Sequence, residues 1–354
     1  MKEQHLKIFA GVFVFLLVIY FVTKPRHTGV HLDELVQNIV IGVSKEDVRV
    51  VEVYKETSSE QLVRMMFTNQ EDQWHIATRY NCKAQKSRMD RLLNDLLDMT
   101  GKVRSSDPKH FDSYQIADAQ GIHLLLKDEA NKPLANLIVG KKGEDYGTGF
   151  VRFAGKEKVY FVDKNILSSL SIYGEIDTLS RFKDDSFVDL EAVNQDKEKL
   201  EMVGLSANRK EMLLKKNEKE VEYTADDSTK ATKIETEWVL LKGKNSEISL
   251  DQKEVDNFFG DVAKIRAQEV VDRVGNTLAD INKNARYGFS RPSHYIVFKA
   301  PEGPQQNILF GKEYEKDKGY YMHVQYDGLV YKLTKSTFDK IFKWMDELPK
   351  KVAE

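Results

Sequence analysis

The chain has 354 residues, which is enough for two domains of ordinary size beside a short N-terminal segment. Apolar residues make up 41% and charged residues 31% of the chain, which predicts a folded core with a charged exterior and excludes a disordered protein. The formal net charge is −2 and Cys82 is the single cysteine, so the composition favours no nucleic-acid partner and excludes an internal disulfide.

The first feature along the chain is an apolar run at residues 8–22, which contains no charged or amide side chain. At about 1.5 Å per residue the run is short for a hydrocarbon core of roughly 30 Å, but lysines on both flanks can extend its reach. We therefore expect residues 1–27 to form an N-terminal stub and a transmembrane anchor. The anchor residues singled out are Ile8, Phe13, Leu16, Leu17, Ile19 and Phe21.

Two other interpretations of this run stay open. A cleaved signal peptide requires small residues after the apolar run, whereas Phe21, Val22, Thr23 and Lys24 stand there. A buried core helix would have to begin next to the terminus with lysine on both flanks. Basic residues at both ends do not fix the orientation by charge. Because the short N-terminal stub cannot fold, we place it in the cytoplasm and the bulk of the chain outside.

Apolar residues between positions 31 and 43 recur with helical spacing. They are Leu32, Leu35, Val36, Ile39, Val40 and Val43. This pattern predicts an amphipathic segment over residues 28–44 that lies on the membrane or against a partner's helix. Its polar face has no lysine or arginine to hold anionic lipid, which argues against the membrane. The alternatives are that the apolar face packs on the following domain, or that residues 39–43 form a first strand.

The first half of the rest of the chain alternates between apolar and polar residues, which predicts antiparallel strands. Strands are expected over residues 48–54, 62–67, 122–126, 134–139, 150–153 and 159–162, with another closed by Trp74. The expected helical faces are Met89, Leu92, Leu93, Leu96 and Leu97, and later Ile166, Leu167 and Leu170.

The second half runs in the same order. Strands are expected over residues 200–205, 211–215, 295–298, 308–310, 321–324 and 330–333, with one closed by Trp238. The helical faces are Val255, Phe258, Phe259, Val262 and Ile265, and later Phe338, Ile341 and Phe342. The polar tract over residues 217–237 is either a long loop or an extended hairpin.

Order and spacing together indicate an internal duplication. Gly140 and Tyr160 are twenty residues apart, and so are Gly311 and Tyr331. The sequence therefore predicts an α+β fold: an N-terminal transmembrane helix followed by two tandem similar repeats, each mainly antiparallel sheet with about two helices. We place the first repeat at residues 45–183 and the second at residues 184–354.

Several short motifs recur at matching places in the two halves: a tryptophan strand, a helix, a tyrosine–glycine element, a strand that ends in glycine, and a later valine–tyrosine pair. The residues that carry them are Tyr287-Gly288, Gly140, Gly311, Val159-Tyr160 and Val330-Tyr331. Over roughly residues 45–345 this pattern resembles the bacterial DUF4340 family, a domain of unknown function. The junction at residues 181–184 is similar to the family's junction between repeats. Tyr114-Gln115 departs from the pattern, because tyrosine–glycine is expected there.

The resemblance implies a location and a class of partner. Family members are typically anchored by one N-terminal helix, and many are encoded beside subunits of gliding-motility-type ABC transporters. It therefore implies a single-pass protein of the bacterial cytoplasmic (inner) membrane, with the bulk of the chain in the periplasm. The expected partners are the lipid bilayer and a membrane-protein complex such as ABC transporter subunits. No catalytic residues carry over from the family.

The motifs that could carry chemistry have structural explanations. Residues 140–149 are glycine-rich but lack the Gly-Lys-Ser/Thr ending of a phosphate loop, so a wide hairpin is expected. Acidic residues at 144–145 and 313–317 are interleaved with lysines, as solvated loop charges are. The histidines expected on strands are His123, His294 and His323, and the tyrosines that could stack are Tyr320, Tyr321 and Tyr326. We expect no catalytic residue, cofactor, metal or nucleic-acid partner.

The sequence favours a non-catalytic, membrane-anchored interaction protein. The alternative is an envelope module that binds a small molecule or glycan between the two repeats. Both interpretations single out the same four aromatic residues as a partner or ligand surface: Trp74, Tyr114, Trp238 and Tyr287. An envelope hydrolase whose site is assembled only by the fold is a third interpretation.

Overall fold

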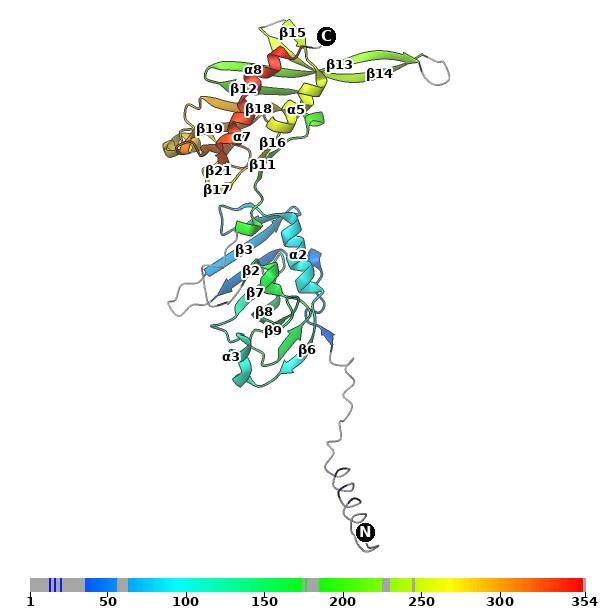
Figure 1. Ribbon diagram of the computed structural model, residues 1–354, viewed down its shortest axis with the longest axis vertical. Helices are drawn as coiled ribbons and strands as arrows, with labels where there is room; N and C mark the ends of the chain where they lie inside the picture. The colour runs from blue at the N-terminus through cyan, green and yellow to red at the C-terminus, as the bar shows by residue number, and fades with distance from the viewer. Residues whose placement is uncertain are drawn as a thin grey trace, which may run out of the picture.

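A computed structural model describes residues 13, 16, 20, 36–55, 63–173, 176, 185–224, 230–243 and 246–352. Two large antiparallel sheets with few helices dominate the fold (Figure 1). The expected α+β class with mainly antiparallel sheet is confirmed. We call the first sheet with its helices the first unit, and the second sheet with its helices the second unit.

The expected anchor falls almost entirely outside the described residues. Of the six anchor residues singled out above, Phe13 and Leu16 are described, and both are helical and exposed. Ile8, Leu17, Ile19 and Phe21 lie outside the described residues. In the part of the chain that the structure describes, no helix has the length and apolar character needed to span a membrane.

The first sheet has ten strands within the described residues, in the order β1-β6-β10-β9-β8-β7-β2-β3-β4-β5. All of its strand pairs are antiparallel. The strands are β1 (Gln37–Asn38), β2 (Val50–Lys55), β3 (Val63–Gln70), β4 (Gln73–Ile76), β5 (Cys82–Lys83), β6 (Thr100–Ser105), β7 (Ile122–Lys127), β8 (Pro133–Lys142), β9 (Gly149–Phe153) and β10 (Val159–Val162).

The two faces of the first sheet are covered differently. Helices α2 (Lys86–Leu97) and α4 (Ile166–Ser169) pack on one face, where Met89, Leu92 and Leu93 are fully buried. The helical spacing of these residues makes α2 amphipathic, so its apolar side joins the core. The opposite face carries a smaller apolar cluster beside the turn η3 (Pro108–His110) and the short helix α3 (Phe111–Tyr114).

The second sheet has nine strands within the described residues, in the order β15-β14-β13-β12-β18-β19-β20-β21-β17. They are β12 (Met202–Ala207), β13 (Lys210–Thr224), β14 (Lys230–Lys242), β15 (Ser246–Ser249), β17 (Glu269–Arg273), β18 (His294–Lys299), β19 (Gln306–Glu315), β20 (Gly319–Val324) and β21 (Leu329–Thr334). The helices of this unit are α5 (Gln252–Val262), α6 (Leu278–Lys283), α7 (Lys335–Phe342) and α8 (Trp344–Glu347). A separate two-stranded sheet pairs β11 (Glu191–Asn194) with β16 (Lys264–Arg266).

The two sheets follow the same strand order. From β5, the first sheet runs β5-β4-β3-β2-β7-β8-β9-β10-β6, and from β15 the second runs β15-β14-β13-β12-β18-β19-β20-β21-β17. Strands at the same place in these two orders also come at the same place along the chain of their unit. Helices α2 and α5 follow β5 and β15, and α4 and α7 follow β10 and β21, at corresponding places. The first sheet extends one strand further, because β1 pairs with β6.

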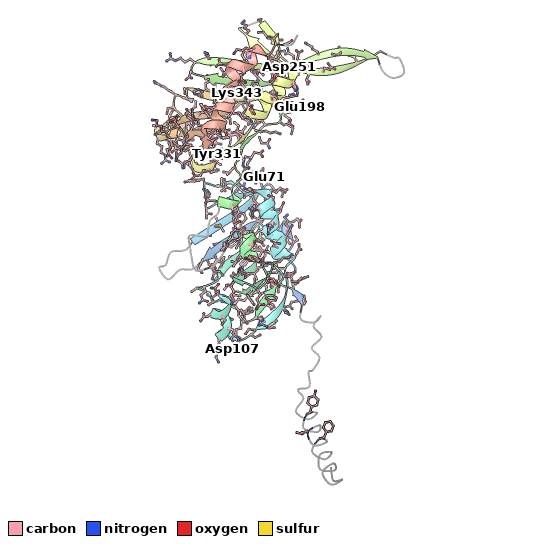
Figure 2. All side chains as sticks on the ribbon, in the orientation of Figure 1. Glu71, Asp107, Glu198, Asp251, Tyr331 and Lys343 are labelled. Atoms are coloured by element: carbon pink, nitrogen blue, oxygen red, sulfur yellow. The ribbon has the colours of Figure 1, made fainter. Side chains whose placement is uncertain are left out.

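The junction between the units is packed and hydrogen-bonded. The rings of Phe67 and Phe187 lie 4.8 Å apart, and both belong to one apolar core that continues into the second unit. Arg273 of β17 donates to the carbonyl oxygens of Tyr80 (2.6 Å) and Asn81 (3.1 Å) in the first unit. Figure 2 shows Glu71 and Tyr331 at the facing ends of the two units.

The prediction of an amphipathic helix over residues 31–43 is wrong for residues 36–43, the described part, because no helix forms there. Gln37 and Asn38 form β1, and Ile39 and Val40 are buried in the core. The helical spacing misled because these apolar side chains pack on the first unit, which was one of the alternatives. A strand does form here, but it ends before residue 39. Residues 31–35 lie outside the described residues.

The polar tract after residue 216 forms an extended hairpin, one of the two structures expected for it. Strands β13 and β14 pair from Leu214↔Leu240 to Thr224↔Lys230 and project from the second unit (Figure 1). Residues 225–229 lie outside the described residues. A strand expected near Leu190 is confirmed as β11, whereas Ile265, expected on a helical face, lies in β16. The sequence did not indicate β5, β6, β15, β16 or β17, because these short strands lack a clear alternation of apolar and polar residues.

Candidate functional site

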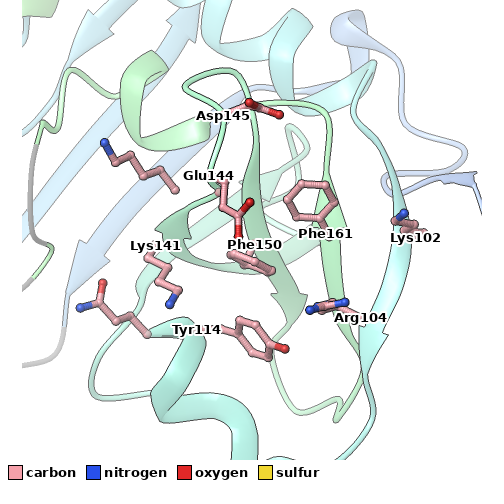
Figure 3. A pocket seen from close by; sticks show the side chains of 11 residues that line it. Lys102, Arg104, Tyr114, Lys141, Glu144, Asp145, Phe150 and Phe161 are labelled. Atoms are coloured by element: carbon pink, nitrogen blue, oxygen red, sulfur yellow. The ribbon is translucent and has the colours of Figure 1, made fainter.

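A cavity of about 710 Å³ opens on the face of the first sheet that α2 and α4 leave uncovered. Figure 3 shows Lys102 and Arg104 on one side of it, Lys141 on the other, and aromatic rings between them. The volume lies in the range typical of small-molecule sites. The lining residues are Lys102, Arg104, Tyr114, Gln115, Lys141, Lys142, Gly143, Glu144, Asp145, Phe150 and Phe161.

Three aromatic rings form the floor of the cavity. The rings of Tyr114 and Phe150 lie 4.6 Å apart, and those of Phe150 and Phe161 lie 5.4 Å apart. Phe150 on β9 pairs with Phe161 on β10, so both side chains point to the same face of the sheet. Tyr114 is the last residue of α3. The floor therefore offers a continuous apolar surface beside charged walls.

The position of Tyr114 depends on its neighbours. Gln115 adopts the left-handed conformation that ends α3, with φ 53°. A Cβ atom at Gly140 would lie 2.3 Å from the Tyr114 carbonyl oxygen, so only glycine lets this turn settle on β8. Arg152 is 2% exposed, donates to the Ile116 carbonyl (2.7 Å), and forms an ion pair with Asp118 (2.6 Å). These contacts hold the chain that follows Tyr114 against the sheet.

The cations of the cavity come from two separate strands. Lys102 on β6 lies opposite Phe161, and Arg104 is the extra residue at a β-bulge between the pairs Val159↔Ser105 and Tyr160↔Val103. Bulges commonly redirect a side chain next to a functional site. Lys141 comes from the end of β8. Among the described residues, none of these three side chains lies within 4.0 Å of a carboxylate oxygen.

The hairpin between β8 and β9 supplies the remaining charges. Lys142 lies 4.4 Å from the centre of the Tyr146 ring, a cation–π contact. Glu144 and Asp145 are exposed on the same hairpin. Four cations and two carboxylates therefore line the cavity, so it favours an anionic group.

On the corresponding face of the second unit, the edge strand carries acidic instead of basic side chains. Lys332 on β21 lies opposite Glu269 on β17, at the place where Phe161 lies opposite Lys102 in the first unit. Lys332 and Glu269 form an ion pair of 2.8 Å. Asp272 accepts a hydrogen bond from the Tyr287 hydroxyl (2.8 Å) and pairs with Arg286. Burial, and then this hydrogen bond, raise the pKa of Tyr287 to about 12. Both acidic side chains of this edge strand are therefore paired with cations of the same unit.

The two faces nevertheless share one packing device. A Cβ atom at Gly311 would lie 2.0 Å from the Tyr287 carbonyl oxygen, as one at Gly140 would meet that of Tyr114. Gly288 follows Tyr287 with φ 82°, the left-handed conformation that Gln115 adopts in the first unit. The departure from tyrosine–glycine at Tyr114-Gln115 therefore preserves the backbone conformation.

Residues 74–237 match the model of a family described as "Domain of unknown function (DUF4340)". The resemblance of the chain to this family is confirmed over these residues, which are slightly less than half of the chain. The match begins in β4 of the first unit and ends in β14 of the second, so it contains every residue that lines the cavity. No curated protein and no solved structure matches the chain.

The structure separates the four aromatic residues that were expected to share a surface. Tyr114 lines the cavity. Trp74 and Trp238 are 4% and 1% exposed and belong to the core, so they cannot present a surface. Tyr287 is 7% exposed and is held by Asp272. Large aromatic side chains on alternating strands face the core more often than a ligand, and this accounts for the difference.

The cavity also lies elsewhere than expected for a ligand site between the two repeats. The residues that line it all belong to the first unit. Two further cavities, of about 290 Å³ and 840 Å³, are each lined by residues of one unit only. The larger of them carries Glu157 between Lys156 and Lys158, so its charge is nearly balanced. The residues missed by sequence reasoning are Lys102, Arg104, Phe150 and Phe161, whose strands gave no sign that they meet.

The remaining sequence motifs have structural roles. The glycine-rich residues 140–149 connect β8 to β9 as a hairpin. His123 bonds the Asp118 carbonyl (2.8 Å), His323 bonds the Gly275 carbonyl (3.0 Å), and His294 packs on Phe338 and Phe342. These three histidines are not brought together. Within the described residues, no group of three or more potential ligands could hold a metal ion.

Proposed function

We propose that this protein is a non-catalytic binding protein of the bacterial cytoplasmic membrane. The N-terminal segment anchors it, the two units lie in the periplasm, and the first unit holds a subunit of a membrane complex such as an ABC transporter. The observation that carries this proposal is the cavity of about 710 Å³, whose cations lack an ion-pair partner among the described residues.

Binding suits this cavity better than catalysis. Its polar side chains are lysine, arginine, glutamine, tyrosine and two exposed carboxylates, and no serine, cysteine or histidine lines it. Lysine and arginine beside aromatic rings recognise anionic and apolar groups together, and arginine with aromatic residues is enriched where proteins bind one another. The cavity can therefore hold a ligand tightly without activating a nucleophile.

The two units support a division of roles. We propose that they are tandem repeats of one ancestral unit, because they share a strand order and the paired glycine–tyrosine contacts at Gly140 and Gly311. After duplication, one copy kept ion pairs such as Lys332–Glu269 on the face beside its edge strand, and the other kept unpaired cations there. In this account, the second unit acts as a spacer and the first as the binding unit.

Purification of the full-length, C-terminally tagged protein from native membrane in a mild detergent tests the proposal. Integral-membrane subunits are expected to co-purify in fixed proportion, as judged by mass spectrometry. Recovery of the protein alone, in several mild detergents, would contradict it.

A small molecule or glycan is a second candidate ligand, because the cavity has the volume of a small-molecule site. It would bind in the first unit rather than between the units. This candidate predicts that the purified protein gains thermal stability with an anionic sugar, while no membrane subunit co-purifies.

A further inference from the structure

The strand edge beside the cavity has no partner along most of its length. One edge of β6 pairs with β10, and the other pairs with β1 only at Thr100 and Gly101. Within the described residues, the outer edge of residues 102–105 therefore has no neighbouring strand. Exposed backbone N–H and C=O groups of this kind can accept an added strand from a partner.

The side chains on this edge define the charge of such a partner. Lys102 and Arg104 are exposed on β6, and neither lies near a carboxylate of the described residues. In the second unit the corresponding strand β17 carries Glu269 and Asp272, which are paired with Lys332 and Arg286. The two edge strands thus differ in charge, and only β6 offers free cations. An added strand on β6 would place every second side chain on the cavity face, beside these cations.

The aromatic floor defines the second requirement. Phe161 lies directly opposite Lys102 on the neighbouring strand, and its ring contacts Phe150. Both rings line the open cavity. A partner residue two positions from an acidic one would face the same side of the sheet. Because strands lie about 4.8 Å apart and β10 is the second strand from the added one, a large apolar side chain would extend across β6 toward Phe161, the nearer ring.

We propose that an extended acidic segment of a partner protein binds along the outer edge of β6, with an acidic side chain at Lys102 and Arg104 and an apolar side chain directed toward Phe161. Main-chain hydrogen bonds to residues 102–105 supply affinity, and the cations with the cavity supply specificity. This inference rests on the proposed function, because it names the chemistry by which the membrane partner is recognised.

Fluorescence anisotropy with the full-length protein in detergent micelles tests the inference. The probe is a labelled octapeptide, Glu-Ser-Phe-Ser-Glu-Ser-Phe-Ser, which places glutamate and phenylalanine on one face of a strand. We expect binding that weakens as salt rises, because exposed charges are screened. Replacing both glutamates by lysine, or the central serines by proline, should abolish it. Equal binding of the lysine peptide would overturn the inference.

Matched variants locate the site. The double variant Lys102→Ala/Arg104→Ala should weaken peptide binding roughly twofold to thirtyfold, as expected for the loss of two exposed ion pairs. Lys132→Ala/Lys158→Ala removes the same charge from the first unit outside this cavity and should leave binding unchanged. Equal effects of the two double variants would overturn the inference, and so would preference for phosphatidylglycerol vesicles or oligogalacturonate over the peptide.

The same variants separate this inference from the proposed function. If membrane subunits co-purify with the wild-type protein but equally with Lys102→Ala/Arg104→Ala, the proposed function stands and the β6 site is refuted. If the peptide binds at β6 and no membrane subunit co-purifies, the site stands and the proposed function is refuted.

Discussion

The close approach of a tyrosine carbonyl to a strand glycine gives the sharpest stability prediction. Alanine at Gly140 would place Cβ 2.3 Å from the Tyr114 carbonyl oxygen, and alanine at Gly311 would place it 2.0 Å from that of Tyr287. Ordinary contacts of this kind are longer than 3 Å, so the turn must move in both variants. In each unit the contacted atom is a backbone carbonyl oxygen and not the end of a flexible side chain, so the backbone itself must shift.

The expected magnitude follows from overpacking. Forcing one extra carbon into a well-packed site costs about 1–3 kcal/mol, and the larger value is expected for Gly311 because its contact is closer. In a unit of this size, each kcal/mol lowers Tm by roughly 2–4 °C. Gly147 is the matched control, because nothing lies within 4 Å of a Cβ atom there. Gly147→Ala should leave the free energy of unfolding nearly unchanged.

Urea unfolding followed by circular dichroism measures this effect on the full-length protein in detergent. Peptide anisotropy on the same variants adds a second measurement. Gly140→Ala displaces Tyr114 and should weaken peptide binding, whereas Gly311→Ala lies in the other unit and should lower stability alone. If all three alanine variants unfold at the same urea concentration, the packing argument is wrong.

Three further predictions concern the junction and buried polar groups. Arg273→Ala removes hydrogen bonds to Tyr80 and Asn81 and should lower the free energy of unfolding by only about 1 kcal/mol in urea titrations, since the side chain is exposed. Burial lowers the pKa of His323 below 6.5, so the unfolded chain binds a proton more readily than the folded one. The stability contributed by this residue is therefore present above about pH 6.5 and is lost as pH falls. A His323→Gln variant should show a flatter dependence of unfolding free energy on pH between about pH 7 and 5. Tyr287→Phe leaves Asp272 without its hydroxyl partner and should cost about 0.5–1.5 kcal/mol, measured by thermal unfolding, while ligand binding in the first unit is unaffected.

Much of the fold follows from local patterns. The strands around Trp74 and Trp238, the helix that contains Met89, and the matched glycines Gly140 and Gly311 all lie where the sequence placed them. These features depend on periodicity and spacing, which a single sequence displays directly. The short polar strand β6 has no such pattern, because an edge strand has one wet side and few core residues. Its absence from the prediction also hid the pairing with β1.

The candidate site was less accessible to prediction because it arises from a difference between the two units. Lys102 stands where the second unit has Glu269, and Phe161 stands where it has Lys332. These correspondences depend on strand register, which is fixed only when β6 and β17 are paired with their neighbours. With the register known, alignment of the two halves would have revealed an ion pair in one unit and its absence in the other.

Photo-crosslinking in native membranes tests the central claim most directly. A photoreactive residue in place of Val103, which is 38% exposed on β6, keeps both Lys102 and Arg104 in position. The same residue in place of Leu278, which is 70% exposed on α6 of the second unit, is the control. The account predicts that position 103 captures a subunit of a membrane complex and that position 278 does not. Capture from position 278 alone, or no capture from position 103, would contradict it.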